Sequence, residues 1–538
     1  KNNKFSWFED GKLDVYKNLV NLRKDYGIYF VNTKKKIKYV PIKTIDKNVN
    51  NFCLNIIDLK KKFKIKKVIL HCSSSEESCL SMLAFTRLGI HFSVIFEELS
   101  MHAINQRIQI FKPDLILSKN NIYLNNLKQL KINKNIKFLN FDKLIKLNTK
   151  DNKIIKNKIV KSNDNFFTLF TSGTTGEPKG ITHSYGGYLL YSKLTCMNQF
   201  GLKEKSLMFT ASDAGWINGH TYALFGPMSL CCSSILIERP ALILEEKFLL
   251  EIIKLKVQVL YLPVTLIRMM KSFFGNNIIK SRYLKTLGSM GEPLAPEVAK
   301  WYSNKFNLNS KSIVNTYFQT ETGGIISSPN YKNLSKKILH GSIGNPMTNK
   351  IKLTKLDKEK KEIKILSPWP GCMKDIINGL SFWKKYWDKD GNFKLFDEGY
   401  RFKNNNFVSG RTDDVINIRG HRVGSAEIES ILLKNKNIIE ACAISINDFL
   451  EGKVLIIFIV SKKNIDKKVN TLISENFGTF ALPKKIIYTP ELPKTRSGKI
   501  MRRLLRDLIE NPTDKDYGDT TTLLNPNIIK YIKNEIQK

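Results

Sequence analysis

The chain has 538 residues, 42% of them hydrophobic, which is enough to bury the cores of two or more folded units. Its longest apolar run, Val454 to Val460, is far shorter than the roughly 20 residues of a membrane-spanning helix, and the amino end has no apolar signal core. We therefore expect a cytoplasmic protein with no membrane partner. The net charge of +40 would suit nucleic acid, but the lysines are spread along the chain without an arginine–aromatic platform, so no nucleic-acid partner is expected.

Short β-branched runs alternate with helical patterns in the first part of the chain. Strands are predicted at 67–71, 91–96 and 114–118, with helices at 75–89 and 100–110 between them. Ser74 and Glu77 have the spacing of a capping box that would begin the first helix. Because this alternation builds a parallel sheet covered by helices, an α/β domain is predicted.

A loop rich in glycine and small hydroxyls follows a predicted strand at 166–170. The polar segment before that strand, 119–165, is predicted to be a surface excursion. The loop runs from Thr171 to Gly180, and its composition lets amides and hydroxyls approach a polyphosphate while Lys179 adds positive charge. Its spacing is not that of a Walker loop, so it predicts phosphate binding outside the P-loop class.

From Asp413 onward the chain begins a second βα pattern. Strands are predicted at 415–418, 438–446, 454–460 and 485–489, with a helix at 425–434. A domain boundary is therefore predicted at this point, dividing the chain into an amino-terminal domain of residues 1–412 and a smaller carboxy-terminal domain of residues 413–538. The cysteines and histidines lack the spacings of zinc sites, so imidazole- or thiolate-based metal chemistry is not expected.

The loop at 171–180 resembles the signature loop of the adenylate-forming superfamily, and other segments narrow the resemblance to AMP-forming short-chain acyl-CoA synthetases of the acetyl-CoA synthetase type. These segments are Gly215 to Tyr222, Leu287 to Pro293, Tyr317 to Gly324, Gly410 to Asp414, Gly420 to Glu429, Leu492 to Arg503 and Gly518 to Leu523. The resemblance implies a large ATP/acyl-binding α/β domain with parallel sheets and packed helices, and a small mobile α+β carboxy-terminal lid.

The same resemblance implies a reaction in which a short-chain acid, acetate first and propionate second, is ligated to coenzyme A through an acyl-adenylate. Pyrophosphate and AMP would be released, ATP and coenzyme A would be substrates, and Mg2+ the cofactor. Two alternatives stay open. One is an adenylating ligase whose acceptor is a carrier-protein thiol or an amine, and the other is a non-catalytic basic binding protein on the same fold.

By resemblance, the nucleotide contacts fall on four parts of the sequence. They are Thr171, Ser172, Gly173, Thr174, Thr175, Gly176 and Lys179; Gly291, Glu292 and Pro293; Asn315, Thr316, Tyr317, Phe318, Gln319 and Thr320; and Asp397, Arg411 and Arg422. The resemblance also implies that Lys499 is the catalytic lysine. A cation of this kind is needed there because two repelling anions must meet in a dry site. Glu321 is the implied Mg2+ ligand, and Asp413 the implied hinge.

The acyl pocket implied by the resemblance is small. Its walls would be Trp216, Ile217, Asn218, Met290 and Phe318. Acetate enzymes usually have Val, Thr, Val and Trp at the last four of these positions, so Phe318 enlarges the pocket while Ile217 and Met290 narrow it. Arg419 and Gly420 are the implied coenzyme A contacts. The arginine pair that usually binds the coenzyme A 3′-phosphate is replaced by the stretch Asn121 to Asn126.

Overall fold

The computed structural model describes most of the chain between residues 6 and 537. The positions outside the description are 1–5, 98, 100, 120, 130–134, 147–152, 173–177, 276, 309–311, 331–337, 349–350, 378, 412–414, 419–420, 449–451, 478, 496–497, 513–516, 518–519, 521–522 and 538. Among the described residues, no helix has both the length and the apolar composition needed to cross a bilayer.

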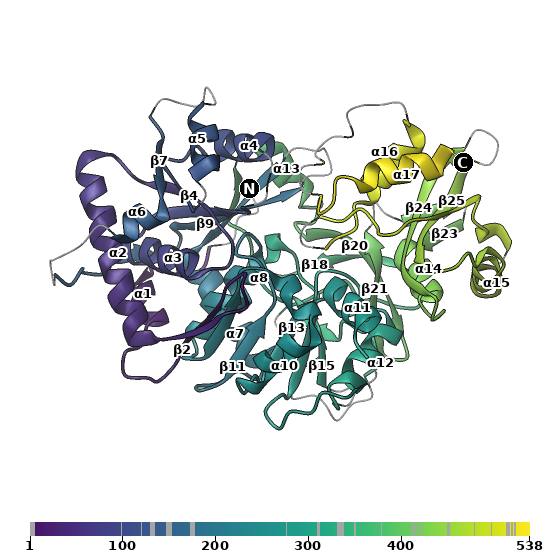
Figure 1. Cartoon of the computed structure of the whole chain (residues 1–538), viewed down its shortest axis with the longest axis horizontal. Coiled ribbons are helices and arrows are strands. Elements are labelled where there is room, and N and C mark those ends of the chain that lie inside the picture. The colour runs from purple at the N-terminus through teal and green to yellow at the C-terminus, as the bar shows by residue number, and fades with distance from the viewer. Residues whose placement is uncertain are drawn as a thin grey trace.

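The first of two large sheets occupies the amino-terminal part of the molecule (Figure 1). Its described strands lie in the order β19 (Asp375–Ile377), β10 (Pro178–Ser184), β9 (Asn165–Ser172), β5 (His91–Ile95), β4 (Lys67–His71), β6 (Leu115–Ser118) and β7 (Lys137–Asn140). The strands from β9 to β7 are parallel, whereas β10 runs antiparallel to both β9 and β19. Nearly every residue of β4 and β5 is buried, as expected for parallel strands covered on both faces.

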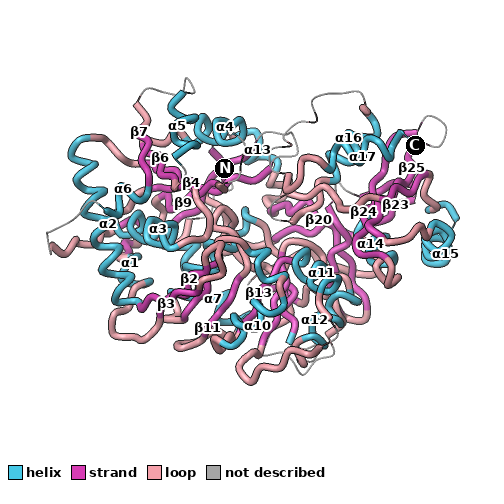
Figure 2. Tube along the Cα trace, in the orientation of Figure 1, coloured by secondary structure: helices cyan, strands magenta, loops and turns pink. Residues whose placement is uncertain are grey.

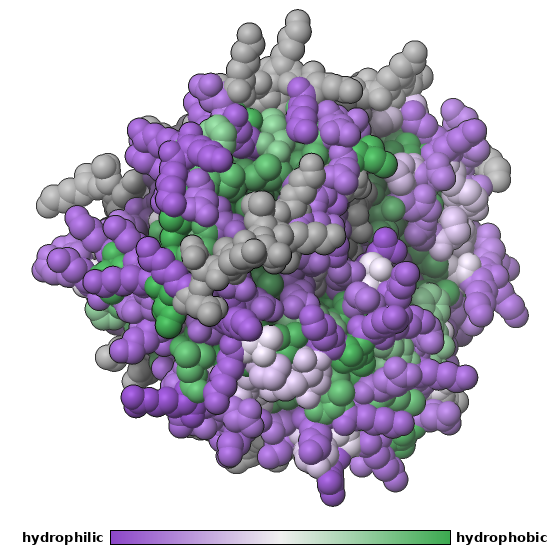
Figure 3. All heavy atoms as spheres, turned by 60° about the vertical axis from the view of Figure 1, so that its left-hand side comes forward, coloured by the Kyte–Doolittle hydropathy of each residue, from purple (hydrophilic) through white to green (hydrophobic). Residues whose placement is uncertain are grey.

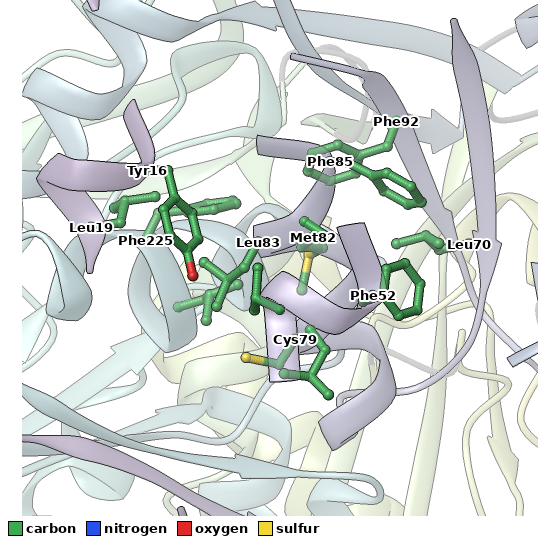
Figure 4. Packing of buried hydrophobic residues seen from close by; sticks show 14 of the residues in the cluster. Tyr16, Leu19, Phe52, Leu70, Cys79, Met82, Leu83, Phe85, Phe92 and Phe225 are labelled. Carbon is green, nitrogen blue, oxygen red and sulfur yellow. The ribbon is translucent and has the colours of Figure 1, made fainter. Parts of the chain in front are cut away.

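Helices pack beside this sheet and form its core with it. They are α1 (Val15–Leu19), α2 (Ile42–Lys62), α3 (Glu76–Leu88), α4 (Met101–Phe111), α5 (Asn121–Gln129) and α6 (Phe141–Lys146). Figure 4 shows Met82 and Phe85 of α3 packed near Phe52 of α2, with Tyr16 of α1 close by. Helix α3 ends at Gly89 in the left-handed conformation, which a residue without Cβ adopts at little cost. The α/β pattern predicted for 67–118 is confirmed.

The capping box predicted at Ser74 and Glu77 is wrong by one residue. Helix α3 is capped by Ser75, whose hydroxyl accepts from the amide of Ser78, while the Ser78 hydroxyl accepts from the amide of Ser75. The Ser74 hydroxyl instead donates to the carbonyl of Ser212 at 3.0 Å. A tertiary contact therefore decides which serine caps the helix.

The second large sheet carries most of the predicted site segments. Its described order is β15 (Ile313–Asn315), β14 (Thr286–Met290), β13 (Val259–Pro263), β11 (Leu207–Thr210), β12 (Ser233–Ile237), β2 (Gly27–Val31) and β3 (Ile37–Pro41), all parallel except the β2–β3 pair. Helices α7 (Tyr185–Phe200), α8 (Ile217–His220), α9 (Gly226–Met228), α10 (Glu246–Lys254), α11 (Val264–Phe273) and α12 (Pro296–Lys305) belong to this part. Carboxyl ends of parallel strands are where ligands bind in open α/β sheets.

A small antiparallel sheet lies between the large sheets and the carboxy-terminal part. It consists of β18 (Lys361–Ile365), β20 (Phe393–Phe402) and β21 (Asn405–Arg411), and the short helix α13 (Leu380–Lys385) lies between β18 and β20 in the chain. Short pairs formed by β1 (Lys12–Leu13) with β8 (Val160–Lys161) and by β16 (Ser327–Ser328) with β17 (Asn345–Pro346) complete the described strands of this half.

The carboxy-terminal part lies at one end of the long axis (Figures 1 and 2). Its elements are β22 (Val415–Ile418), β23 (His421–Gly424), α14 (Ser425–Leu432), β24 (Ile438–Asp448), β25 (Gly452–Ser461), α15 (Asp466–Phe477), β26 (Lys485–Tyr488), α16 (Arg502–Glu510) and α17 (Ile528–Gln537). The predicted strands and helix of this region are confirmed within a few residues. Helix α11 contacts β24, and one hydrophobic cluster includes Leu266 of α11 and Ile428 of α14, so the two parts share a core.

One face of the molecule is largely hydrophilic. Figure 3 shows a face on which hydrophilic side chains cover most of the area, with hydrophobic side chains in smaller separate patches. Hydrophilic side chains of this kind are solvated at the surface.

Candidate active site

The segment Tyr317 to Gly324 forms a tight turn that buries a carboxylate. A 3-10 helix spans Thr320–Thr322, and Gln319 caps its start. Glu321, in the middle of this turn, is only 8% exposed. Its Oε1 accepts a hydrogen bond of 2.6 Å from the hydroxyl of Tyr386, a residue just beyond α13. The predicted metal ligand is thus a buried carboxylate held by a distant tyrosine.

Asp397 of β20 lies beside the same turn. Its Oδ2 accepts from the hydroxyl of Tyr317 at 2.7 Å and from Nε2 of Gln319 at 2.8 Å. In the β20–β21 pair, Asp397 is directly opposite Arg411. The structure therefore brings together residues that were predicted as nucleotide contacts from three separate segments.

The predicted phosphate loop connects two antiparallel strands. Thr171 of β9 is paired with Lys179 of β10. The Nζ of Lys179 lies 4.7 Å from the ring centre of Phe382 and 5.5 Å from that of Tyr386. The loop's lysine and the buried Glu321 therefore contact the same tyrosine.

Several predicted residues lie outside the described part of the chain. They are Gly173, Thr174, Thr175, Gly176, Asp413, Arg419 and Gly420, together with the side chains of Ser172, Arg411 and Arg422. Their roles stay predictions.

Gly291, directly after β14, has free space beside its main chain. Gly291 has φ +91°, and within the described structure no heavy atom lies within 4 Å of where its Cβ would be. Pro293 is exposed, whereas Glu292 is mostly buried and forms an ion pair with Arg268 of α11. A left-handed glycine with free space beside it lets a planar ligand approach the main chain closely.

Asn315 and Thr316 are engaged within the protein. The Asn315 amide donates to the carbonyls of Gly341 and Ser342 at 3.0 and 3.2 Å, and its oxygen accepts from Ser289 at 2.9 Å. The Thr316 hydroxyl donates to the Ser289 carbonyl at 2.7 Å. Their side chains fix the end of β15 beneath the site.

One buried histidine holds the turn by a hydrogen bond, and a second buried histidine interacts electrostatically with the first. The Nε2 of His183 donates to the carbonyl of Thr320 at 2.8 Å. Burial lowers the pKa of His183 to about 4, although the bond to Thr320 opposes this shift. Burial, with a smaller contribution from His183, lowers the pKa of His220 to about 3. Both rings are therefore neutral near pH 7.

The predicted acyl pocket combines two hydrophobic clusters. Ile217 belongs to one cluster and Met290 to another, and Phe318 packs against both. Trp216 lies against Phe96, with ring centres 4.9 Å apart. In the same turn, the buried Oδ1 of Asn218 has no hydrogen-bond partner within the described residues. The predicted wall is thus largely apolar, with one amide oxygen in it.

Lys499 lies in a loop that meets the amino-terminal part. Lys494 and Ile500 form an antiparallel bridge, and within the loop the amide of Lys499 donates to the hydroxyl of Thr495 at 3.2 Å. Gly498 has φ +82°, and a Cβ there would be 2.3 Å from Oγ1 of Thr265 at the start of α11. The exposed Lys499 is therefore presented at the junction with α11.

Buried charges connect α11 with the carboxy-terminal part. We call this group the interdomain ion cluster; it consists of Arg268, Glu292, Glu429, Glu440, Lys494 and Arg502. Lys494 pairs with Glu440 at 2.5 Å, and Arg502 pairs with Glu429 at 2.6 Å. Burial lowers the pKa of the Arg268 guanidinium, but the charges of Glu292, Glu440 and Glu429 outweigh burial and raise it.

Two known protein families match this chain. The model of the AMP-binding enzyme family matches residues 57–368, and the model of the AMP-binding enzyme C-terminal domain matches residues 427–499. The chain belongs to the AMP-binding enzyme family. The predicted family resemblance is confirmed.

Similar curated proteins cover nearly the whole chain of this AMP-binding enzyme. An acetyl-coenzyme A synthetase of Leptospira biflexa is 32% identical, over 99% of this chain and 90% of its own length. Acetyl-coenzyme A synthetase of Helicobacter pylori strain HPAG1 is 30% identical, over 99% and 89%. Acetyl-coenzyme A synthetase 1 of Kluyveromyces lactis is 30% identical, over 99% and 83%.

Two solved structures share the fold of this AMP-binding enzyme. The anthranilate CoA ligase AuaEII, solved with anthranoyl-AMP, superposes with a TM-score of 0.79 at 18% identity and covers 92% of this chain and 96% of its own. The acetoacetyl-CoA synthetase of Streptomyces lividans gives a TM-score of 0.79 at 14% identity, over 99% and 88%. The predicted fold class, a large α/β domain with a smaller carboxy-terminal domain, is confirmed.

Sequence reasoning missed two residues that this AMP-binding enzyme places at the site. Tyr386 binds Glu321, and Arg268 binds Glu292, yet neither lies in a segment that carried the resemblance. The dense aromatic run around Trp383 and Trp387 is a signal, but it is equally typical of a hydrophobic core.

Proposed function

We propose that this chain is an AMP-forming acid–CoA ligase that activates acetate first and propionate second through an acyl-adenylate. One observation carries the proposal: α11 contacts both Glu292, beside the open Gly291, and Gly498, beside Lys499. The proposed nucleotide cradle and the proposed catalytic lysine therefore meet at one helix. The curated acetyl-coenzyme A synthetases that match along 99% of the chain support this reading.

The chemistry requires positive charge where two anions join. A carboxylate must attack the α-phosphate of ATP, and like charges repel strongly when water is excluded. We assign Lys499 to the reacting carboxylate and α-phosphate. Asp397 and Arg411 are assigned to the ribose and α-phosphate side, and Arg422 to the phosphates. Gly291 and Pro293 are assigned to the adenine, and Lys179, with the loop before it, to the outer phosphates.

Glu321 suits a metal that arrives with the nucleotide. Mg2+ in nucleotide sites commonly uses one or two carboxylates plus phosphate oxygens and water. The described residues contain no group of three or more His, Cys, Asp or Glu side chains able to hold a metal. A single buried carboxylate that is already oriented by Tyr386 fits that mode. Bound there, the metal would offset charge on the leaving pyrophosphate.

The acid is proposed from the size of the pocket. Ile217 and Met290 are buried, and Phe318 packs against both of their clusters. Each extra methylene changes discrimination by only about 1–3 kcal/mol, so propionate should follow acetate rather than be excluded. Long-chain and aromatic acids should be poor substrates.

The second half-reaction, in which the acyl group passes to coenzyme A, involves residues that lie outside the described structure. We propose Asp413 as the hinge of a carboxy-terminal lid spanning residues 413–538 on an amino-terminal domain of residues 1–412, and Arg419 and Gly420 as contacts for coenzyme A. An Asp413→Pro variant should slow thioester formation more than adenylation. Equal loss in both half-reactions would contradict the hinge.

Pyrophosphate release tests the proposed function directly. It should depend on acid in the order acetate, propionate, butyrate, hexanoate, and AMP release should depend on coenzyme A. A Lys499→Ala variant should lose adenylation by at least about a hundredfold, the range of general charge-stabilising groups. The exposed Lys462→Ala variant is the control and should keep full activity. AMP release that needs an amine instead of coenzyme A, or no acid-dependent pyrophosphate at all, would refute the assignment.

A further inference from the structure

Tyr386 contacts both charged groups that the proposed function assigns to the metal and the outer phosphates. Its hydroxyl donates to Glu321 at 2.6 Å, and its ring lies 5.5 Å from the Nζ of Lys179. Tyr386 is 4% exposed, so both contacts are made in a largely water-excluded place. Polar contacts of this kind are stronger where the dielectric is low.

The ring of Tyr386 is fixed by its neighbours. It stacks on Phe393 at 5.4 Å with an interplanar angle of 21°, and the edge of Phe396 meets it at 77°. The amide of Lys394 donates to the Tyr386 carbonyl at 2.7 Å. A side chain held by stacking and by main-chain bonds can orient a partner without losing much conformational freedom of its own.

The carboxylate of Glu321 needs such a partner. Its own turn fixes the main chain, because the amide of Met373 donates to the Glu321 carbonyl at 2.9 Å. The side chain beyond Cβ could still rotate, and the hydroxyl of Tyr386 fixes one carboxylate oxygen. A pre-oriented carboxylate binds a metal–nucleotide complex more tightly than one that must be ordered on binding.

We propose that Tyr386 is a positioning residue of the nucleotide site: its hydroxyl orients Glu321 for the metal-bound form of ATP, while its ring, with Phe382, supports Lys179. This inference rests on the proposed function, since it needs Glu321 to face the metal. The two contacts of Tyr386 have different roles. The hydroxyl serves the metal-dependent part of binding, and the rings serve the part that is independent of the metal.

Equilibrium binding of a non-hydrolysable ATP analogue tests the inference by calorimetry, with Mg2+ and with EDTA. A Tyr386→Phe variant keeps the ring and deletes the hydroxyl. It should weaken binding about tenfold with Mg2+, the usual effect of losing a hydrogen bond to a charged group, and leave binding in EDTA unchanged. A Phe382→Leu variant should weaken binding equally in both conditions. The exposed Tyr531→Phe variant is the matched control and should change neither affinity.

Other results separate this inference from the proposed function. Equal losses with Mg2+ and EDTA for Tyr386→Phe, or no loss in either, would overturn the positioning role. A Glu321→Gln variant that abolishes the Mg2+ dependence while Tyr386→Phe preserves it would overturn this inference alone. Failure of the unaltered protein to bind the analogue at all would overturn the proposed function itself.

Discussion

His220 is a buried titratable residue that lowers the stability of the fold in acid. Its ring stacks on Phe92 with an interplanar angle of 14° and lies 4.5 Å from the ring centre of Phe167. Neither ring nitrogen has a hydrogen-bond partner within the described residues. Since the folded protein holds this ring neutral to about pH 3, the unfolded chain takes up the proton first as the pH falls.

Acid should therefore destabilise the fold through His220. Between the unfolded pKa of about 6.5 and the folded pKa of about 3, this residue should remove up to about 1.4 kcal/mol of unfolding free energy per pH unit, and almost none at higher pH. In a His220→Phe variant, the unfolding free energy measured by urea should fall less steeply with decreasing pH, by that amount per pH unit. A half-buried histidine, His340, whose pKa burial also lowers, is the matched control and should change the slope less. An unchanged slope in His220→Phe would show that folding does not lower the pKa of this ring.

The loop that carries Lys499 depends on a glycine at its tip. Any Cβ at Gly498 meets Thr265, and φ +82° is unfavourable for other residues. A Gly498→Ala variant should store about 1–3 kcal/mol of strain or move the loop off α11, and adenylation should fall about tenfold or more. Gly275→Ala, where the described structure leaves the Cβ position open, should keep both activity and stability. Stopped-flow adenylation and thermal unfolding measure both effects, and a fully active Gly498→Ala would separate the loop position from catalysis.

Strands and helices were largely predictable because their signals are local. The strand at 67–71 is β4 to the residue, and the predicted helix at 75–89 is α3 with its two end residues as caps. The capping serine was not predictable, because three consecutive serines offer similar hydroxyls and the distant Ser212 carbonyl takes one of them. Tyr386 was missed for the same reason, since its partner is far away in the sequence.

At the scale of the molecule, the interdomain ion cluster controls how the two parts fit. Removing one member of a buried ion pair leaves its partner uncompensated, at a cost of about 3–5 kcal/mol. An Arg268→Met variant leaves Glu292 without its cation and Glu440 and Glu429 with fewer nearby positive charges. It should lose stability of that order, and adenylation with it, because Gly498 and Glu292 contact the same helix.

A surface ion pair serves as the control for the effect of removing a charge from the interdomain ion cluster. Lys361 and Asp357 are both about half exposed, and such pairs contribute little to stability because water screens their charges. Lys361→Met should therefore leave urea unfolding and adenylation nearly unchanged. If Arg268→Met were equally neutral, the cluster would not hold the carboxy-terminal part against α11.

Strand β19 affects when the first large sheet can be completed during translation. It pairs with β10, directly beyond the predicted phosphate loop, yet it is encoded far downstream of that loop. A ribosome-bound chain that stops before Asp375 would present β10 as an unprotected edge, open to pairing with other nascent chains. The candidate site can thus be completed only late in translation, because Asp375–Ile377 closes the sheet shortly before Tyr386, just beyond α13, supplies the hydrogen bond to Glu321.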